Sequence, residues 1–366
     1  MNKLSVFRYF DLVLFGSSVL LLLLGLLMIY SNTYEAGAGL FYRQVVFAFV
    51  GLILMFALAM YDYRNLKKAT GYIYLFIVLA LIVVWWFAEP IRGSARWIDL
   101  GFFRFQPAEF AKLALVIVTA KVLDQYGEKI KSFPYVLLSL MYVLIPLGLI
   151  VIQPDLGTAL VIFFTWAGML MLSKVKKTHL LWLFLAFLIA AILAWSSVLH
   201  DYQKQRIHTF LNPTADPQGQ GYNVLQSIIA VGSGQYLGRG VGRGLQSQLK
   251  FLPERQTDFI FASTAEELGF IGSSIILIAF LILFLRLLKT MQISRDNFGM
   301  YLSLGVFFMM LTQALVNIGM NLGLLPVTGI PLPLLSYGGS SLITTFLALG
   351  IVQSIVARQK VIRFGG

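Results

Sequence analysis

The chain has 366 residues, of which 58% are hydrophobic and 12% are charged, and its formal net charge is +12. A mean hydropathy of +0.82 is too apolar for a soluble protein of this length. The sequence contains no cysteine, which excludes disulfides and thiolate metal sites. We therefore expect an all-α integral membrane protein that forms a single polytopic domain over residues 1–366.

Apolar segments long enough to cross a membrane recur along the whole chain. The first follows Lys3 and Arg8, as a signal peptide would, but it is too long and no small-residue cleavage site follows it, so we interpret it as a true helix. The composition thus predicts about ten transmembrane helices. In chain order they cover residues 10–31, 43–61, 72–88, 107–124, 135–151, 157–173, 178–199, 265–286, 300–322 and 337–358.

The basic residues lie in short groups between these spans, which argues against a nucleic-acid-binding face. With the amino terminus inside, about 17 of the 28 basic residues fall on one side, as the positive-inside rule requires. Both termini are then cytoplasmic. The polar segment 200–262, between the seventh and eighth spans, becomes a long extracytoplasmic loop.

The outer face has little positive bias, so its arginines need another reason, and an anionic ligand supplies one. Two of them, Arg96 and Arg104, are close to aromatic residues in the sequence, where an ordinary loop would rarely have an arginine. Gln106 and Ser336 belong to polar motifs on the same face. The substrate-binding candidates are Arg96, Arg104, Gln106, Arg206, Arg239, Arg243, Arg255 and Ser336.

Ionisable residues also occur within the fourth predicted span. Glu109 and Lys112 are three residues apart, which predicts an ion pair on one helix face. Because charges in a membrane are costly, the pair either lines a cavity or forms a structural salt bridge. Gln313, Asn317 and Asn321 recur every fourth residue and predict a polar stripe, which lines the same cavity or makes hydrogen bonds between helices.

The long loop ends with the segment 251–262, which contains a lone aspartate, Asp258, beside a membrane entry. Its residue type and position favour a helix N-cap, and a functional carboxylate is the other interpretation. The glycine-rich run 238–244 carries Arg239 and Arg243. It favours either a phosphate contact or a flexible linker.

Several motifs, taken in order over nearly the whole chain, closely resemble the SEDS family of shape, elongation, division and sporulation proteins. Gln256 departs from the histidine that is common in the family at this position. Short termini and the amino-acid sequence of residues 246–255 favour the elongation branch of this family over its division branch. The motifs are Gly93–Trp97, Phe105–Lys112, Gln153–Thr158, Gly221–Asn223, Gly232–Gly234, Phe251–Phe261, Ala265–Gly269 and Ser336–Ser341.

The resemblance implies a ten-helix glycosyltransferase of the bacterial cytoplasmic membrane that polymerises lipid II on the outer face. The functional aspartate of the family matches Asp258, and its embedded pair matches Glu109 and Lys112. The resemblance also implies a class B penicillin-binding protein, a transpeptidase, as partner. A role in cell elongation and shape follows.

The chemistry agrees with that role, because an acceptor hydroxyl needs a base and a polyprenyl diphosphate leaving group needs positive charge. Asp258 is the expected general base of an inverting transfer. It is alternatively a ligand of a divalent cation, Mg²⁺ or Mn²⁺. Two other functions stay open: a transporter that flips lipid II, and a scaffold for cell-wall enzymes.

Overall fold

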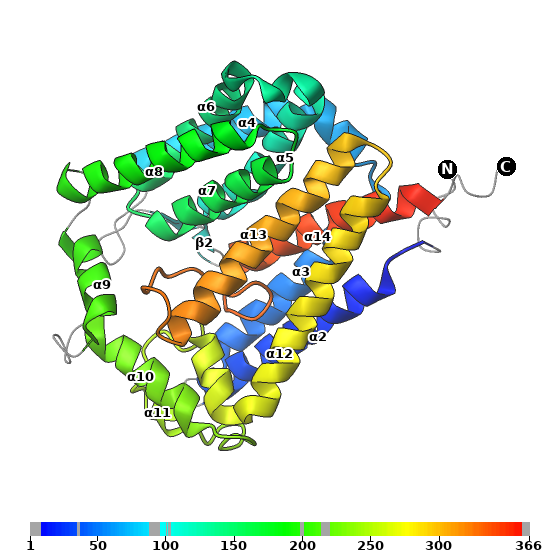
Figure 1. The fold of residues 1–366 in the computed structure, drawn as a ribbon. Coiled ribbons are helices and arrows are strands. Elements are labelled where there is room, and N and C mark those ends of the chain that lie inside the picture. The colour runs from blue at the N-terminus through cyan, green and yellow to red at the C-terminus, as the bar shows by residue number, and fades with distance from the viewer. Residues whose placement is uncertain are drawn as a thin grey trace.

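The computed structural model describes residues 9–34, 37–87, 96–99, 101, 104–197, 201–213 and 220–360. Parts of the predicted outer loop, the ends of two predicted spans and residues 93–95 of the first motif lie outside this set. Most of the described chain is helical (Figure 1). The helices are α2 (Leu12–Thr33), α3 (Gly39–Met60), α4 (Arg64–Phe87), α5 (Pro107–Tyr126), α6 (Phe133–Ile152), α7 (Leu156–Met171), α8 (Lys177–Ser197), α9 (Asp201–Leu211), α10 (Gln220–Ser233), α11 (Leu245–Gln248), α12 (Ile260–Ile293), α13 (Asn297–Asn321) and α14 (Gly339–Lys360).

A short 3-10 helix and a pair of short strands complete the described secondary structure. A 3-10 helix, η2 (Gly127–Lys131), joins α5 to α6. The strands β1 (Ile98–Asp99) and β2 (Arg104–Phe105) pair antiparallel, with Asp99 opposite Arg104. This hairpin leads directly into α5, whose first residue is Pro107.

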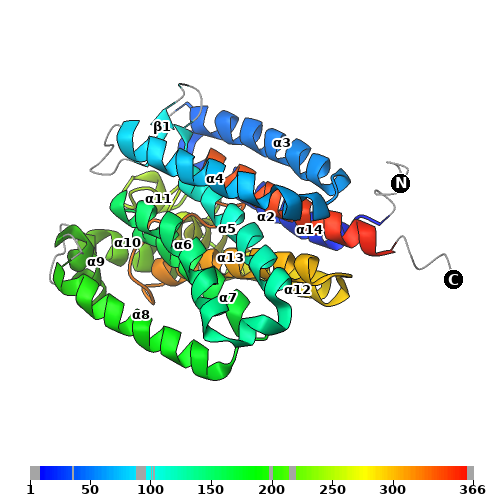
Figure 2. The same ribbon diagram turned by 90° about the horizontal axis from the view of Figure 1, so that it is seen from above.

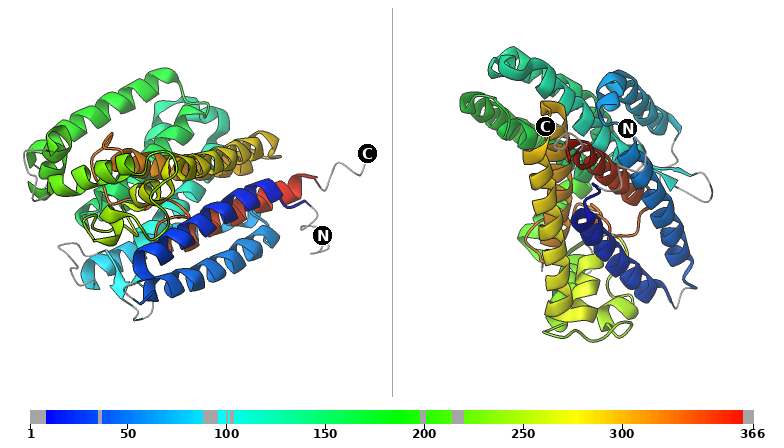
Figure 3. Two further views of the ribbon diagram at one scale, coloured as in Figure 1. Left: turned by 90° about the horizontal axis from the view of Figure 1, so that it is seen from below. Right: turned by 90° about the vertical axis from the view of Figure 1, so that its right-hand side faces the viewer.

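The helices form one bundle in which α14 packs along α3, and α12 packs against both α2 and α13. Helix α5 lies inside, in contact with α4, α7 and α13, while α8 lies at the edge of the bundle (Figures 1 and 2). The start of α2 and the end of α14 lie at one end, and α9 to α11 occupy the opposite end (Figures 1 and 3). The polar segments predicted on one face of the membrane therefore gather at one end of the bundle.

Seven of the described helices, α2, α3, α4, α6, α12, α13 and α14, are long and apolar enough to cross a membrane. Helix α7 is shorter, and α8 has a short apolar section. The apolar sequence of helix α5 is interrupted by ionisable residues, among them Glu109 and Lys112, although the helix is continuous and most of its side chains are buried. The protein is a multi-pass membrane protein, with exposed aromatic side chains such as Trp86 and Trp182 on its outward faces.

Helix α12 is broken, where the sequence predicted one continuous span over 265–286. Gly269 has φ 65° and ψ −161°, which no residue in an α-helix adopts, and it divides α12 into residues 260–268 and 270–293. The break leaves carbonyls exposed at the end of the first part and N–H groups at the start of the second. In an apolar surrounding these groups need partners.

The segment 234–251, called the glycine loop below, supplies those partners on both sides of the break. The N–H groups of Arg239 and Gly240 donate to the carbonyls of Glu266 and Glu267, each at 3.0 Å. The N–H of Phe270 in turn donates to the carbonyl of Gln235 at 2.8 Å. One loop therefore caps both halves of the broken helix.

Such close packing explains the glycines of this loop. A Cβ on Gly238 would lie 2.2 Å from the carbonyl oxygen of Glu267, and one on Gly234 would lie 1.9 Å from that of Ala265. Gly238 also has φ 79°. Gly234 and Gly238 therefore serve a backbone-to-backbone contact, which a flexible linker would not make.

We predict that Gly238→Ala destabilises the fold by about 2 kcal/mol or more, because it adds left-handed strain to overpacking. The matched control is Gly232→Ala, which adds its methyl group inside α10 with no atom within 4 Å. Thermal unfolding of both variants in detergent measures the difference. An unchanged melting temperature for Gly238→Ala would contradict this account of the break.

Candidate functional site

Asp258 precedes α12, and its position is set by two asparagines of α13. Its carbonyl accepts hydrogen bonds from Nδ2 of Asn317 and Nδ2 of Asn321, each at 3.0 Å. Phe259 occupies the N-cap position, so Asp258 is not the N-cap residue of the helix. Oδ2 of the half-buried aspartate lies 3.5 Å from the place of a Cβ on Gly329. The carboxylate thus rests against the backbone of the segment that follows α13.

The polar stripe on α13 holds two chain segments together. Asn317 also donates to the carbonyl of Ile330 at 2.8 Å, and Oδ1 of Asn321 accepts from the N–H of Ala262 at 2.9 Å. Hydrogen bonding, the second interpretation of this stripe, therefore accounts for both asparagines. Gln313 is buried, and its Oε1 has no hydrogen-bond partner within the described chain.

Ser336 supports Asp258 from the other side. Its hydroxyl donates to the carbonyl of Thr257 at 2.6 Å and accepts from the N–H of Leu332 at 2.8 Å. The N–H of Tyr337 donates to the carbonyl of Gln256 at 2.8 Å. Because the single hydroxyl proton of Ser336 is already used, the geometry gives this residue a positioning role beside Asp258.

Arg96 and Gln106 converge on Asp155, the N-cap of α7. Nη1 of Arg96 lies 3.6 Å from Oδ1 of Asp155, and Nε2 of Gln106 donates to Oδ2 at 3.2 Å. Arg96 also donates to the carbonyls of Gln153 and Pro154. The turn between α6 and α7 is therefore fastened to the chain that precedes α5.

A cavity of about 90 Å³ opens beside this turn. Two predicted arginines, Arg96 and Arg206, lie in its wall, the second on α9. Thr328 lines it as well, and the next residue, Gly329, lies beside the carboxylate of Asp258. The lining residues are Arg96, Pro154, Leu156, Gly157, Leu160, Gln203, Arg206, Ile207, Pro326, Val327 and Thr328.

The other predicted arginines lie elsewhere. Arg104 pairs with Asp99 at 3.2 Å on the exposed hairpin. The N–H of Gly101, which donates to the Asp99 carboxyl, and then Arg104 hold the pKa of this carboxyl below its usual value. Arg255 is buried and donates to the carbonyl of Asn32 at 2.6 Å. Arg239 and Arg243 are exposed on the glycine loop, and neither forms an ion pair with another described residue.

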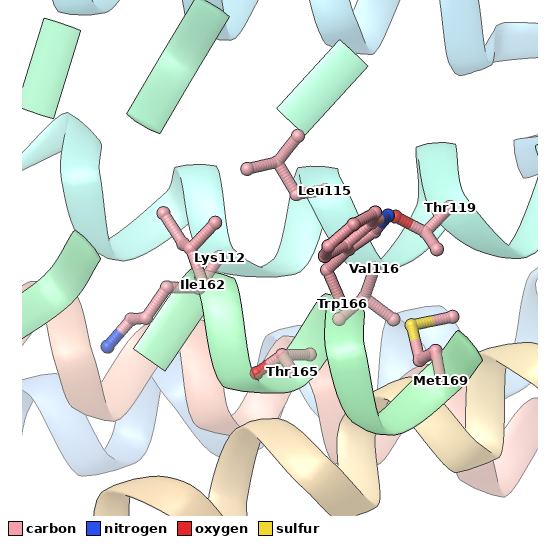
Figure 4. Close-up of a pocket in the computed structure, with 8 residues that line it drawn as sticks. All are labelled: Lys112, Leu115, Val116, Thr119, Ile162, Thr165, Trp166 and Met169. Carbon is pink, nitrogen blue, oxygen red and sulfur yellow. The ribbon is translucent and has the colours of Figure 1, made fainter. Parts of the chain in front are cut away.

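Glu109 and Lys112 form the expected ion pair, with 2.7 Å between Nζ and Oε2 and side chains only 4% and 2% exposed. Lys112 borders a pocket of about 10 Å³ between α5 and α7 (Figure 4). Such a space holds about one water molecule. The pair therefore lies in a closed part of the bundle, in the first two turns of α5.

Arg43, on α3, was not among the sequence candidates. It forms a side-chain hydrogen bond with Tyr337 and opposes the effect of burial, which raises the pKa of the Tyr337 hydroxyl. Its positive charge also contributes, as the smallest of the causes, to the lowered pKa of the Asp99 carboxyl. The sequence placed Arg43 at the start of a predicted span, so it was not counted with the loop arginines. Its contact with the Ser336–Ser341 motif depends on tertiary packing.

The chain matches the FtsW, RodA and SpoVE family of cell cycle proteins over residues 11–361. It belongs to this family. The peptidoglycan glycosyltransferase MrdB of Escherichia coli is 37% identical over 366 residues, which cover 97% of this chain and 96% of MrdB. The resemblance to the SEDS family is thereby confirmed.

Two solved structures extend the similarity to the fold. A chain of a peptidoglycan synthase complex that coordinates polymerization and crosslinking is 32% identical, with a TM-score of 0.81, and the match covers 96% of this chain and 99% of that one. The rod shape determining protein RodA of Thermus thermophilus is 30% identical, with a TM-score of 0.72, over 96% of this chain and 98% of that one. The helical arrangement of this family member is therefore RodA-like.

We predict that Asn317→Leu lowers the glycosyltransferase activity for which its relatives are named by about 100-fold, because a displacement near 1 Å is enough for such a loss. The control is Gln313→Leu, one turn away on the same helix, which breaks no hydrogen bond and should retain activity. Rates are compared at equal amounts of folded protein. Equal rates for the two variants would contradict the positioning role of Asn317.

Proposed function

We propose that this protein is a peptidoglycan glycosyltransferase that polymerises lipid II into glycan strands and serves cell elongation and shape. One observation carries the proposal: Asp258 is held by backbone contacts beside a cavity that bears Arg96 and Arg206. A base and two cations are the groups that transfer from a lipid diphosphate requires. The name of MrdB supports the same activity.

We further propose that α2 to α8 and α12 to α14 are ten membrane spans, with both termini in the cytoplasm. The start of α2 and the end of α14 lie at one end of the bundle, and α9 to α11 lie at the opposite end, which supports this topology (Figure 2). Segment 200–262 then faces the outside of the bacterial cytoplasmic membrane. The cavity and Asp258 lie on that face, where lipid II is joined.

In the proposed reaction, a hydroxyl of the acceptor sugar attacks the anomeric carbon of the donor, and Asp258 takes the hydroxyl proton. The new glycosidic bond forms as the bond to the diphosphate oxygen breaks, and that oxygen leaves with the electron pair. Direct displacement inverts the configuration. The guanidinium of Arg206, with that of Arg96, offsets the charge on the released polyprenyl diphosphate.

A divalent cation, Mg²⁺ or Mn²⁺, fits this site only when it is shared with the substrate. Within the described chain no three His, Cys, Asp or Glu side chains gather to hold a metal. Mg²⁺ is commonly bound by one or two carboxylates together with substrate phosphates, so Asp258 and the diphosphate would hold it. The cation would add positive charge at the leaving group.

We propose a class B penicillin-binding protein as the partner that crosslinks the new strands. The similar chain from a complex that coordinates polymerization and crosslinking supports such an assembly. The exposed apolar helices offer surfaces for such a partner as well as for lipid.

Asp258→Asn is expected to lower polymerisation of lipid II by about 100-fold or more, because it removes the base and keeps the shape. The control is Glu254→Gln, the carboxylate nearest in the sequence, whose side chain accepts a bond from Thr257 that glutamine can also accept. Glycan is measured with purified protein, with and without the partner and a chelator. Wild-type rates for Asp258→Asn would refute the assignment.

The same preparation tests the transporter alternative. Liposomes that contain labelled lipid II report translocation separately from glycan formation. Translocation without glycan, unaffected by Asp258→Asn, would favour a flippase. Growth supported by Asp258→Asn with intact partners would instead favour a scaffold.

Arg206→Gln is expected to raise the KM for lipid II by about 10-fold, the loss of one charge-assisted contact with a diphosphate. Lys204→Gln is the matched control, since it lies on the same helix outside the cavity lining. Steady-state kinetics of both variants measure the difference. An equal KM for the two would remove Arg206 from the substrate site.

A further inference from the structure

The outward face of the glycine loop carries an unusual mixture of side chains. Tyr236 and Leu237 are each 78% exposed, and Val241, Leu245, Leu249 and Phe251 are exposed as well. Between them stand Arg239, Arg243 and Lys250, all exposed. Residues 234–251 contain no aspartate or glutamate. The loop therefore presents an apolar surface with a net charge of +3, the three bases counted alone.

The inner face of the same loop is held rigidly. Oε2 of Glu267 accepts from the N–H of Gly242 at 3.1 Å, and Oε1 accepts from Nε2 of Gln248 at 2.8 Å. Glu266 accepts from the N–H groups of Gln246 and Ser247 at 2.8 and 2.9 Å. Both glutamates are fully buried. These bonds fix which side chains of the loop face outward, so the exposed surface has a defined structure.

Contacts with α12 fix the position of this surface along the helix, and therefore its depth relative to the membrane. The ring of Tyr236 packs edge-to-face on Phe270, with 6.4 Å between centroids, and its carbonyl accepts from the N–H of Ile271 at 3.2 Å. Residues 270–285 contain no charged side chain, and Phe270 and Ile271 are exposed where this apolar stretch begins. The loop therefore lies at the level where α12 enters hydrocarbon. Figure 1 shows this segment at the end of α12 that lies away from the termini.

We propose that the glycine loop is seated in the headgroup layer of the outer leaflet, with its apolar side chains between lipids and its three bases on anionic phospholipid phosphates. Aromatic and aliphatic side chains beside arginine and lysine suit this layer. The absence of acidic residues from the loop favours a negatively charged surface. The inference rests on the proposed membrane topology and not on the chemistry of Asp258.

The chain has no cysteine, so single cysteines place a fluorophore at chosen positions. Leu237→Cys tests the loop, and Lys129→Cys, exposed in η2 at the opposite end, is the water-facing control. The full-length protein is reconstituted in vesicles of phosphatidylcholine with or without phosphatidylglycerol. Nitroxide lipids should quench the label at 237, and iodide should quench the label at 129.

The three bases are tested by Arg239→Gln, Arg243→Gln and Lys250→Gln combined with Leu237→Cys. The matched control removes three charges elsewhere through Lys129→Gln, Lys176→Gln and Lys177→Gln. Each base near an anionic surface changes partitioning by about fivefold, so only the loop variant should lose the added protection that phosphatidylglycerol gives.

Equal quenching by iodide at 237 and 129 in both vesicle types would overturn the proposal. So would protection at 237 that appears only after a partner protein is added, which would make this face a protein-docking site. Polymerisation is measured on the same samples. Loss of glycan formation with retained protection of the label at 237 would count against the proposed function alone. Glycan formation without that protection would count against the lipid contact of the glycine loop alone.

Discussion

The break in α12 imposes the constraint on which the outer half of this protein depends. A helix interrupted beside lipid exposes backbone groups that only the protein can satisfy. The glycine loop meets this demand through carbonyls and N–H groups that bond on both sides of Gly269. The buried carboxylates of Glu266 and Glu267 then hold the loop by its own N–H groups. A short helix, residues 260–268, is thereby held in place at the end of the membrane-spanning bundle.

The position of Asp258 follows from this arrangement. Asp258 lies just before the start of the short helix, and the asparagines of α13 donate hydrogen bonds to its backbone carbonyl. The Oδ2 atom of its carboxylate lies beside Gly329, the residue after Thr328 of the cavity wall. In the proposed reaction, the amide and hydroxyl groups around Asp258 serve geometry, and the arginines of the cavity supply charge. That division of roles suits a transfer reaction in which position and electrostatics provide most of the catalysis.

Much of the site was predictable from local patterns, and the exceptions share one cause. The spacing of Glu109 and Lys112 predicted their ion pair, since helical neighbours meet without any tertiary information. The hydroxyl of Ser336 was expected to face a substrate, yet it donates to Thr257, 79 residues away in sequence. Arg43 was overlooked because it stands at the start of a hydrophobic run. Both depend on contacts between segments that are far apart in the sequence, which periodicity does not encode.

The sequence by itself determined the membrane character, the approximate position of each long helix, the family and the acidic residue to examine. Those features follow from composition, from local spacing and from motifs that keep their order along the chain. Only the tertiary structure decided that α12 is broken at Gly269, that Arg96 and Arg206 share a cavity while Arg104 and Arg255 do not, and that glycines serve close backbone contact. The physical reason is that these choices depend on which backbone groups meet in space.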